Sequence, residues 1–256
     1  MSSRENAAAE LQKKETELTV ELRSCESRIA LLSELEKNME GFAKATRIVM
    51  QEAARGVLRG VQGPVGQVIR TEDRYALAVE TALGAAVGHV LVDTQDDGKA
   101  AIELLKKRDG GRTTFLPVDT MRPARLTGEP KGEEGYIGVC ADLVETDGRY
   151  AGVISSLLGR TAVAETLSDA VAIARRHRNS FRIVTLDGQL LNAGGSMTGG
   201  SAARNTGILS RANELKRLGA DRSRLHKQLT EVSNQAEQAR RELEKPVMIW
   251  IRPGMS

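Results

Sequence analysis

Two stretches of the chain, GVQGPVGQVIRTEDRYALAVETALG at residues 60–84 and GYIGVCADLVETDGRYAGVISSLLG at residues 135–159, align without gaps at an offset of 75. Eight of the 25 aligned positions are identical: Gly60/Gly135, Gly63/Gly138, Thr71/Thr146, Arg74/Arg149, Tyr75/Tyr150, Ala76/Ala151, Leu83/Leu158 and Gly84/Gly159. Each stretch begins with a glycine-bounded turn, continues as a short extended segment and ends as a helix. The apolar residues of that helix recur every four positions and therefore share one face. The sequence thus predicts a domain built from two related halves.

The segments that follow the two stretches also correspond, as a strand, a helix and a second strand. In the first half they are HVLVDT, DDGKAAIELLKKR and RTTFLPVD, and in the second half TAVAET, LSDAVAIARRHR and FRIVTLD. A chance alignment of short Ala- and Gly-rich segments is the alternative interpretation. Two similar halves imply an internal pseudo-twofold relation. The first half of one chain can then pair with the second half of another, and such a contact closes when it is made twice.

A glycine-rich stretch, NAGGSMTGGSAAR, covers residues 192–204. It is either a plain loop before a helix or an edge strand that pairs with a partner chain. We expect the strand, because glycine lets another backbone approach closely and exposed strand edges are natural sites of β-augmentation.

The same stretch can also be compared with catalytic motifs. It lacks the Lys of a phosphate-binding P-loop and the spacing of a dinucleotide fingerprint. It is similar to the GGSSGGS stretch of amidase-signature hydrolases, so a serine hydrolase that uses Ser196 or Ser201 is the alternative function. The three histidines, His89, His177 and His226, show no triad or metal spacing. The sequence therefore predicts a chain that is not an enzyme and that binds no metal.

Heptad patterns flank this region on both sides. Seam positions, apolar except for Arg222, recur along two arms. The first arm begins at Leu11 and continues one heptad later, at spacings of 4 and 3, with Leu18, Leu22, Cys25, Ile29, Leu32 and, after a slip, Leu35, Met39 and Phe42. The second arm alternates spacings of 3 and 4 through Leu215, Leu218, Arg222, Leu225, Leu229, Val232, Ala236, Ala239 and Leu243. A repeat of 3.5 residues is typical of a coiled coil. Because both arms attach to one domain, we expect them to pair with each other in antiparallel fashion. Two amphipathic helices that cap the domain are the alternative.

The charged residues are unevenly distributed along the chain. The net charge is only +3, but residues 202–228 carry seven basic and two acidic side chains, a local balance of +5. Such a cluster favours sequence-independent contact with phosphates. A plain solvated helix face is the alternative.

Other features of the sequence bear on the cellular compartment and on the C-terminal segment. Cys25 and Cys140 show no CxxC spacing, no apolar run approaches the roughly 20 residues of a membrane span, and no signal peptide opens the chain, so a cytosolic protein is predicted. Residues 246–256 follow Pro246, break the heptad pattern and are interpreted as an expression-derived tail.

The segments GRTTFLP (111–117) and TLDGQLLNAGGSMTGGSAARNTGILSR (185–211), bracketed by heptad arms, resemble the hinge of bacterial SMC (structural maintenance of chromosomes) proteins. The resemblance covers about residues 55–211 and the arm stubs. It implies a mixed α/β hinge domain of two related subdomains, flanked by an antiparallel intramolecular coiled coil. The expected boundaries are 1–54 for the first arm, 55–205 for the hinge (subdomains about 55–130 and 131–205), 206–245 for the second arm and 246–256 for the tail.

The resemblance also implies a function. The segment would be the dimerisation hinge of an ATPase of chromosome condensation and segregation, joining two coiled-coil arms into a V or ring. The implied homodimer contact is Gly194, Gly195, Met197, Gly199 and Gly200. The implied non-specific DNA contacts are Arg204, Arg211, Lys216 and Arg217, with Lys106, Lys107 and Arg112 as weaker candidates.

Further expectations come from the same resemblance. No cofactor is expected in this segment, since ATP and Mg²⁺ would bind only at head domains that this sequence does not contain. Kleisin-type partners would bind only at those heads as well. The expected location is cytoplasmic and nucleoid-associated, with no membrane contact.

Overall fold

The structure is a computed structural model that describes residues 3–201 and 207–244. The chain forms two compact units, an α/β unit of Asn38–Asn213 and a second unit of Met1–Lys37 with Glu214–Ser256. The helices are α1 (Ser3–Lys37), α2 (Lys44–Ala54), α3 (Val65–Val68), α4 (Asp73–Leu83), α5 (Gln95–Lys107), α6 (Ala151–Leu158), α7 (Leu167–Arg176) and α8 (Ile208–Glu244), with 3-10 turns η1 (Gly84–Gly88), η2 (Cys140–Leu143) and η3 (Gly148–Tyr150). The strands are β1 (Val61–Pro64), β2 (Ile69–Arg70), β3 (Val90–Val92), β4 (Phe115–Pro117), β5 (Tyr136–Val139), β6 (Glu145–Thr146), β7 (Thr161–Ala164), β8 (Arg182–Thr185), β9 (Leu190–Leu191) and β10 (Met197–Thr198). The predicted mixed α/β class is confirmed.

The α/β unit contains the predicted duplication. In its first half, β1 pairs antiparallel with β3, and β3 pairs parallel with β4. In its second half, β5 pairs antiparallel with β7, and β7 pairs parallel with β8. The second sheet then continues with β9 and β10, in the order β10-β9-β8-β7-β5. Each half is therefore the same three-stranded unit, and only the second half carries two further strands.

The correspondence extends to details that a chance alignment would not reproduce. The register shifts between Val61 and Gly63 in β1 and between Tyr136 and Gly138 in β5. Helices α5 and α7 both begin with a capping box, formed by Thr94 with Asp97 and by Thr166 with Asp169. A Cβ placed on Gly60 or Gly135 would meet those aspartates at 2.4 Å and 2.2 Å, so both positions need glycine for close packing.

The two halves meet at a short antiparallel pairing of β2 with β6. Arg70 lies opposite Glu145, its own counterpart at the offset of 75. On either side of this pair the Thr71 hydroxyl donates to the carbonyl of Leu143 at 2.6 Å, and the Thr146 hydroxyl donates to that of Val68 at 3.0 Å. These are equivalent bonds made in opposite directions, as a pseudo-twofold axis requires.

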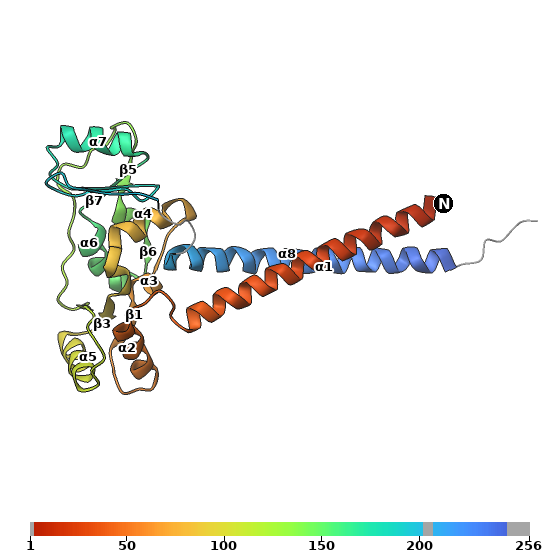
Figure 1. Cartoon of the computed structure of the whole chain (residues 1–256), viewed down its shortest axis with the longest axis horizontal. Coiled ribbons are helices and arrows are strands. Elements are labelled where there is room, and N and C mark those ends of the chain that lie inside the picture. The colour runs from red at the N-terminus through yellow and green to blue at the C-terminus, as the bar shows by residue number, and fades with distance from the viewer. Residues whose placement is uncertain (1–2, 202–206, 245–256) are drawn as a thin grey trace, which may run out of the picture. The chain divides into compact units, whose positions relative to one another are not determined.

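A shared hydrophobic core surrounds this junction. Figure 1 shows α4 and α6 between the two sheets. Their inner faces, Val79 and Leu83 on α4 and Ile154 and Leu158 on α6, lie in one buried cluster, as the sequence predicted. Gly84 and Gly159 directly follow the two helices.

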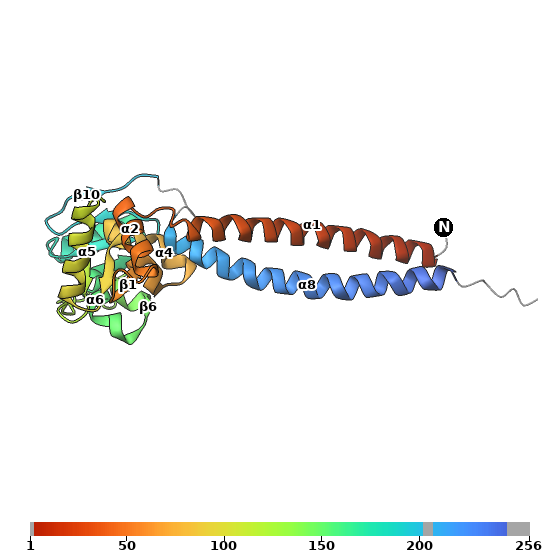
Figure 2. The ribbon, with the colours of Figure 1, turned by 90° about the horizontal axis from the view of Figure 1, so that it is seen from below.

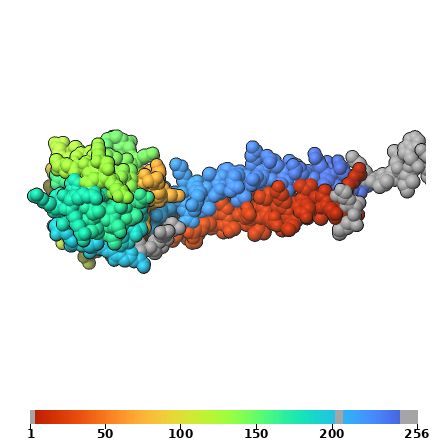
Figure 3. Space-filling view, turned by 90° about the horizontal axis from the view of Figure 1, so that it is seen from above, coloured from red at the N-terminus to blue at the C-terminus, as the bar shows by residue number. Residues whose placement is uncertain are grey.

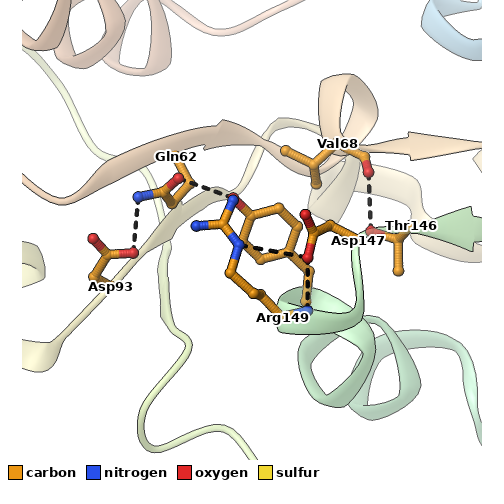
Figure 4. A network of polar contacts seen from close by, with 7 residues as sticks. Gln62, Val68, Asp93, Thr146, Asp147 and Arg149 are labelled. Atoms are coloured by element: carbon orange, nitrogen blue, oxygen red, sulfur yellow. Dashed lines mark hydrogen bonds and ion pairs between the residues drawn. The ribbon is translucent and has the colours of Figure 1, made fainter.

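A polar network crosses between the halves beside the junction (Figure 4). The hydroxyl of Tyr150 donates to the side chain of Gln62 on β1 at 2.9 Å, and Gln62 donates to Asp93 at 2.8 Å. The Arg149 guanidinium lies 5.0 Å from the Tyr150 ring centroid and 3.4 Å from Asp147. The network thereby links η3, which leads into α6, to the first sheet.

The second unit is the predicted antiparallel coiled coil. Figures 2 and 3 show α1 and α8 packed side by side along their length. Arg28 forms an ion pair with Glu214 at 2.8 Å, whereas Arg240 contacts Gln12. Residue numbers therefore fall on α1 as they rise on α8, which establishes the antiparallel direction. Leu22, Cys25 and Leu225 form the buried centre of the seam.

Three details of the arms differ from the predictions. The first arm ends at Lys37 and not at residue 54, because Gly41, with φ of 96°, lies in a turn that separates α1 from α2. Helix α2 belongs instead to the α/β unit, where Ala45 and Val49 join a buried cluster with α5. Arg222 occupies a predicted seam position but is exposed, so the second seam is interrupted there. The proposed tail, residues 246–256, lies outside the described residues.

Within the described part of the chain, no helix has the length and apolar character needed to cross a membrane.

The reciprocal threonine bonds generate a test of the pseudo-symmetry. Thr71→Val and Thr146→Val keep the side-chain shape but leave a carbonyl of the junction without its donor, so each should lower the free energy of unfolding by about 1–3 kcal/mol. Urea denaturation measures this decrease. Thr127 is exposed and outside the junction, and Thr127→Val should change stability by less than about 0.5 kcal/mol. Equal stability of all three variants would contradict the role of the junction.

A buried carboxylate joins α2 to α5. The Glu52 side chain is 2% exposed and lies 2.7 Å from the Arg108 guanidinium and 2.9 Å from that of Arg55. Two separate N–H groups of Arg108 reach the two oxygens of Glu52, a bidentate geometry. Hydrogen bonding to Arg108 lowers the pKa of Glu52 below its ordinary value of 4.5.

This pair predicts a pH dependence of stability. Because the pKa of Glu52 is lowered on folding, its contribution is complete above pH 4.5 and disappears as the pH falls through the lowered value. Glu52→Gln should therefore unfold at lower denaturant than the parent at pH 7, and the two should converge in acid. Glu103→Gln, at an exposed position on α5, is the matched control and should follow the parent throughout.

Candidate functional site

The glycine-rich stretch forms a hairpin at the edge of the second sheet. Met197 and Thr198 of β10 pair antiparallel with Leu191 and Leu190 of β9, so the predicted strand is present. Gly194 and Gly195 form the turn, with φ of 87° and 96°. The Gly194 N–H donates to the Asn179 carbonyl at 2.8 Å, which binds the hairpin turn to the turn that follows α7. These two glycines therefore shape the hairpin itself, before any partner is considered.

A side chain that the sequence pattern did not single out extends this hairpin. The Gln189 amide accepts from the Gly200 N–H at 2.9 Å and donates to the Gly200 carbonyl at 3.1 Å, as a paired strand residue would. A Cβ on Gly199 would lie 2.1 Å from the Gln189 Oε1, so the amide reaches the backbone only because residue 199 is glycine. Gln189 lies within LDGQLL, directly before β9, and nothing in the sequence pattern indicates this contact.

The outer edge of β10 is open. It ends the five-stranded sheet, and no strand of the described residues pairs with its far side. The Met197 side chain is 57% exposed there. An unpaired strand edge that carries an exposed apolar side chain is a favourable surface for β-augmentation.

A second open edge lies in the first half, on β4. Val90 N–H donates to the Thr114 carbonyl and Val118 N–H to the Val92 carbonyl, both at 2.9 Å, which fixes the side of β4 that faces β3. The backbone groups of Phe115 alternate with these and therefore face away. The corresponding edge of β8 in the second half is covered by β9. In the described chain, the edge of β4 has no such cover.

A shallow groove runs along this open edge, between β4 and α5. Ile102, which is 47% exposed, lines it together with Phe115, Pro117 and two lysines, Lys99 and Lys106. Counted from the equivalent N-caps Thr94 and Thr166, the position in the second half that corresponds to Ile102 is Ala174. Ala174 lies in one buried cluster with Leu191 of β9. The same groove is thus filled by a strand in one half and open in the other.

The predicted phosphate-binding residues differ in exposure. Arg211 is only 8% exposed, and its guanidinium donates to the Glu40 carbonyl at 2.6 Å. Its assignment as a DNA contact is therefore corrected, because its guanidinium is buried in the α/β unit and donates to a backbone carbonyl there. Lys216 and Arg217 are exposed, as are Lys106, Lys107 and Arg112 around the end of α5. Arg204 lies outside the described residues.

The hydrolase alternative finds no supporting geometry. The Ser196 hydroxyl accepts from the Asn192 amide at 3.1 Å, and in the described residues no Lys or His bonds to it. Ser201 is exposed. Among the residues that the structure describes, no group of three or more His, Cys, Asp and Glu side chains is placed to hold a metal ion.

Comparison with known proteins gives a consistent result. The family model described as the SMC proteins flexible hinge domain matches residues 58–174. The Chromosome partition protein Smc of Synechococcus is 40% identical over 217 residues, which are 80% of this chain and 18% of that protein. The protein of the same description from Bacillus subtilis is 36% identical over 73% of this chain and 16% of its own length. The chain thus spans less than a fifth of these relatives.

A solved structure covers nearly the whole chain. The crystal structure of an asymmetric dimer of the Geobacillus stearothermophilus SMC hinge domain is 30% identical, with a TM-score of 0.83. The match covers 95% of this chain and 99% of that one. The Pyrococcus furiosus SMC hinge domain is 27% identical, with a TM-score of 0.54 over 71% of this chain. No amidase is among these relatives, and the hydrolase alternative is not supported.

Proposed function

This chain belongs to the SMC hinge family, and from that premise we propose that it joins two copies of a chromosome partition protein as a homodimer. The observation that carries the proposal is the pair of open strand edges, β10 in the second half and β4 in the first. The related Geobacillus stearothermophilus hinge domain crystallised as a dimer, which agrees with this assignment.

In the proposed dimer, β10 of each copy pairs with the open edge of β4 of the other. Met197 then packs beside Ile102 and fills the groove that β9 fills in the second half. The contact is heterologous, since it joins different surfaces, and a twofold axis repeats it to close a two-subunit ring. Among the predicted interface residues, Met197 supplies apolar area, whereas Gly199 and Gly200 keep the strand edge free of side chains.

The coiled-coil unit indicates what this dimer would connect. One pair of arms leaves each copy, so a dimer would join two rods into a V or ring. For a longer protein that contains this segment, we propose a role in chromosome condensation and segregation and a location in the cytoplasm at the nucleoid. We also propose that its head domains bind ATP and Mg²⁺ and kleisin-type partners. For this segment we propose no cofactor and no catalysis.

DNA contact near the start of α8 is the second part of the proposal. Lys216 and Arg217 are exposed, and Glu214 beside them is bound to Arg28 at 2.8 Å, which partly neutralises its charge. Arg222 and Lys227 continue the exposed basic surface along α8. Contact through such a surface would be independent of sequence and sensitive to salt.

Charge substitution tests the dimer. Met197→Asp and Ile102→Lys each place a charge in both copies of the apolar contact, so each variant alone should be monomeric in analytical ultracentrifugation. In an equimolar mixture the two variants should recover a dimer, because one contact is then unchanged and the other pairs the two opposite charges.

The control for this experiment is Val57→Asp. Val57 is 58% exposed and lies outside both strand edges, so this variant should remain dimeric. Circular dichroism checks that all variants are folded. Dimeric single variants, or a mixture that stays monomeric, would place the interface elsewhere.

A second test separates the exposed basic residues from Arg211. The double variant Lys216→Glu with Arg217→Glu should weaken binding to duplex DNA of any sequence and reduce the slope of log K against log salt by about 0.9 for each phosphate that the variant no longer neutralises. The matched control reverses Lys13 and Lys14, which are exposed on α1, and should bind as the parent does. Arg211→Glu should instead destabilise the fold. Fluorescence anisotropy over a salt series measures binding, and unchanged binding by the Lys216/Arg217 variant would exclude this surface.

A further inference from the structure

The first half of the α/β unit holds the beginning of α8. The N–H of Ile208 donates to the Glu80 carboxylate at 2.8 Å, and the Asn213 amide donates to the Thr71 carbonyl at 2.9 Å. The Ile208 side chain lies against Gly66, where a Cβ would come within 3.1 Å of it. Leu209 is 2% exposed and belongs to the central core. The first turn of α8 is therefore bound by a specific surface of the first half.

The corresponding surface of the second half is an open groove. At the offset of 75, three residues that contact the start of α8, Gly66, Thr71 and Glu80, correspond to Ala141, Thr146 and Ser155. All three counterparts line one groove of about 640 Å³. The duplicated fold has thus produced the same surface twice, and in the described residues only the first copy holds a helix.

The segment that joins the two halves forms one wall of this groove without filling it. The Ser155 hydroxyl donates to the Ala124 carbonyl at 2.8 Å, which binds that segment to α6. Val144 and Ile154 supply apolar surface, and Ala151, which is exposed, lies beside them. The volume falls within the range of about 300–1,000 Å³ that is typical of ligand pockets.

The charge at the rim favours a helix N-terminus. Asp142 and Glu145 contribute two carboxylates against one guanidinium, that of Arg125, which lies 2.6 Å from Asp142. The excess negative charge complements the partial positive charge of a helix N-terminus. In the first half the Glu80 carboxylate meets the same end of α8.

We propose that this groove binds the N-terminal turn of a helix from another protein. The fitting helix carries two adjacent branched aliphatic residues in its first turn, as Ile208 and Leu209 do, and a side-chain amide five residues after the first of them, as Asn213 does. The proposal does not depend on the dimer, because the groove includes no residue of β4 or β10.

A peptide of residues 207–220, acetylated at its N-terminus and labelled at its C-terminus, is the probe. It is added to the full chain, whose own α8 already fills the first site. Saturable binding by fluorescence anisotropy is expected, weak because so short a helix is marginal when isolated. Replacing Ile208 and Leu209 of the peptide with serine keeps its charge and should weaken binding at least about tenfold.

Variants of the protein locate the binding. Ala151→Trp fills the groove and Glu145→Lys reverses the charge at its rim, so each should weaken binding at least about tenfold. Ala100→Trp, at an exposed position of α5, is the matched control and should bind as the parent does. Absence of saturable binding, equal binding of the serine peptide, or binding unaffected by Ala151→Trp and Glu145→Lys would overturn the proposal.

Discussion

The antiparallel pairing of β2 with β6 joins the two halves of the α/β unit, and the shared core around it fixes their relative position. Each half alone has three strands of the common sheet unit and a small cluster of its own, and domains of that size bury too little surface to be very stable. The larger cluster draws residues from both halves, so folding of one half depends on the other. The reciprocal bonds of Thr71 and Thr146 then fix the register.

The two halves share one three-stranded unit, and the proposed binding surfaces lie where the halves differ. In the second half, β9 and β10 extend the sheet beyond β8. In the first half, the corresponding edge of β4 is open. The first half holds the start of α8 on the surface that the second half leaves as a groove. Each difference leaves one copy of a surface occupied and the other free. In each case the occupied copy is the guide to the partner that we propose for the free copy.

Periodicity and repetition made most of the fold predictable. The heptads indicated the coiled coil and the offset of 75 indicated the two halves, because both are properties of many residues at once. Features set by single backbone contacts were missed. The charge pattern marked Arg211 as a surface residue, although its guanidinium binds the Glu40 carbonyl. Helix α1 ends at Lys37 because of a turn, although the apolar pattern continues across that turn. The Gln189 side chain bonds to the backbone of Gly200, and no sequence pattern indicates this contact.

Thr71 connects the features that matter for a hinge. Its hydroxyl donates across the junction to Leu143, and its own carbonyl accepts from Asn213 on the first turns of α8. Two residues before it, Ile69 lies in the central core and pairs with Thr146 of the other half. Thr71 therefore takes part both in the junction between the halves and in the bonding of the segment that begins α8.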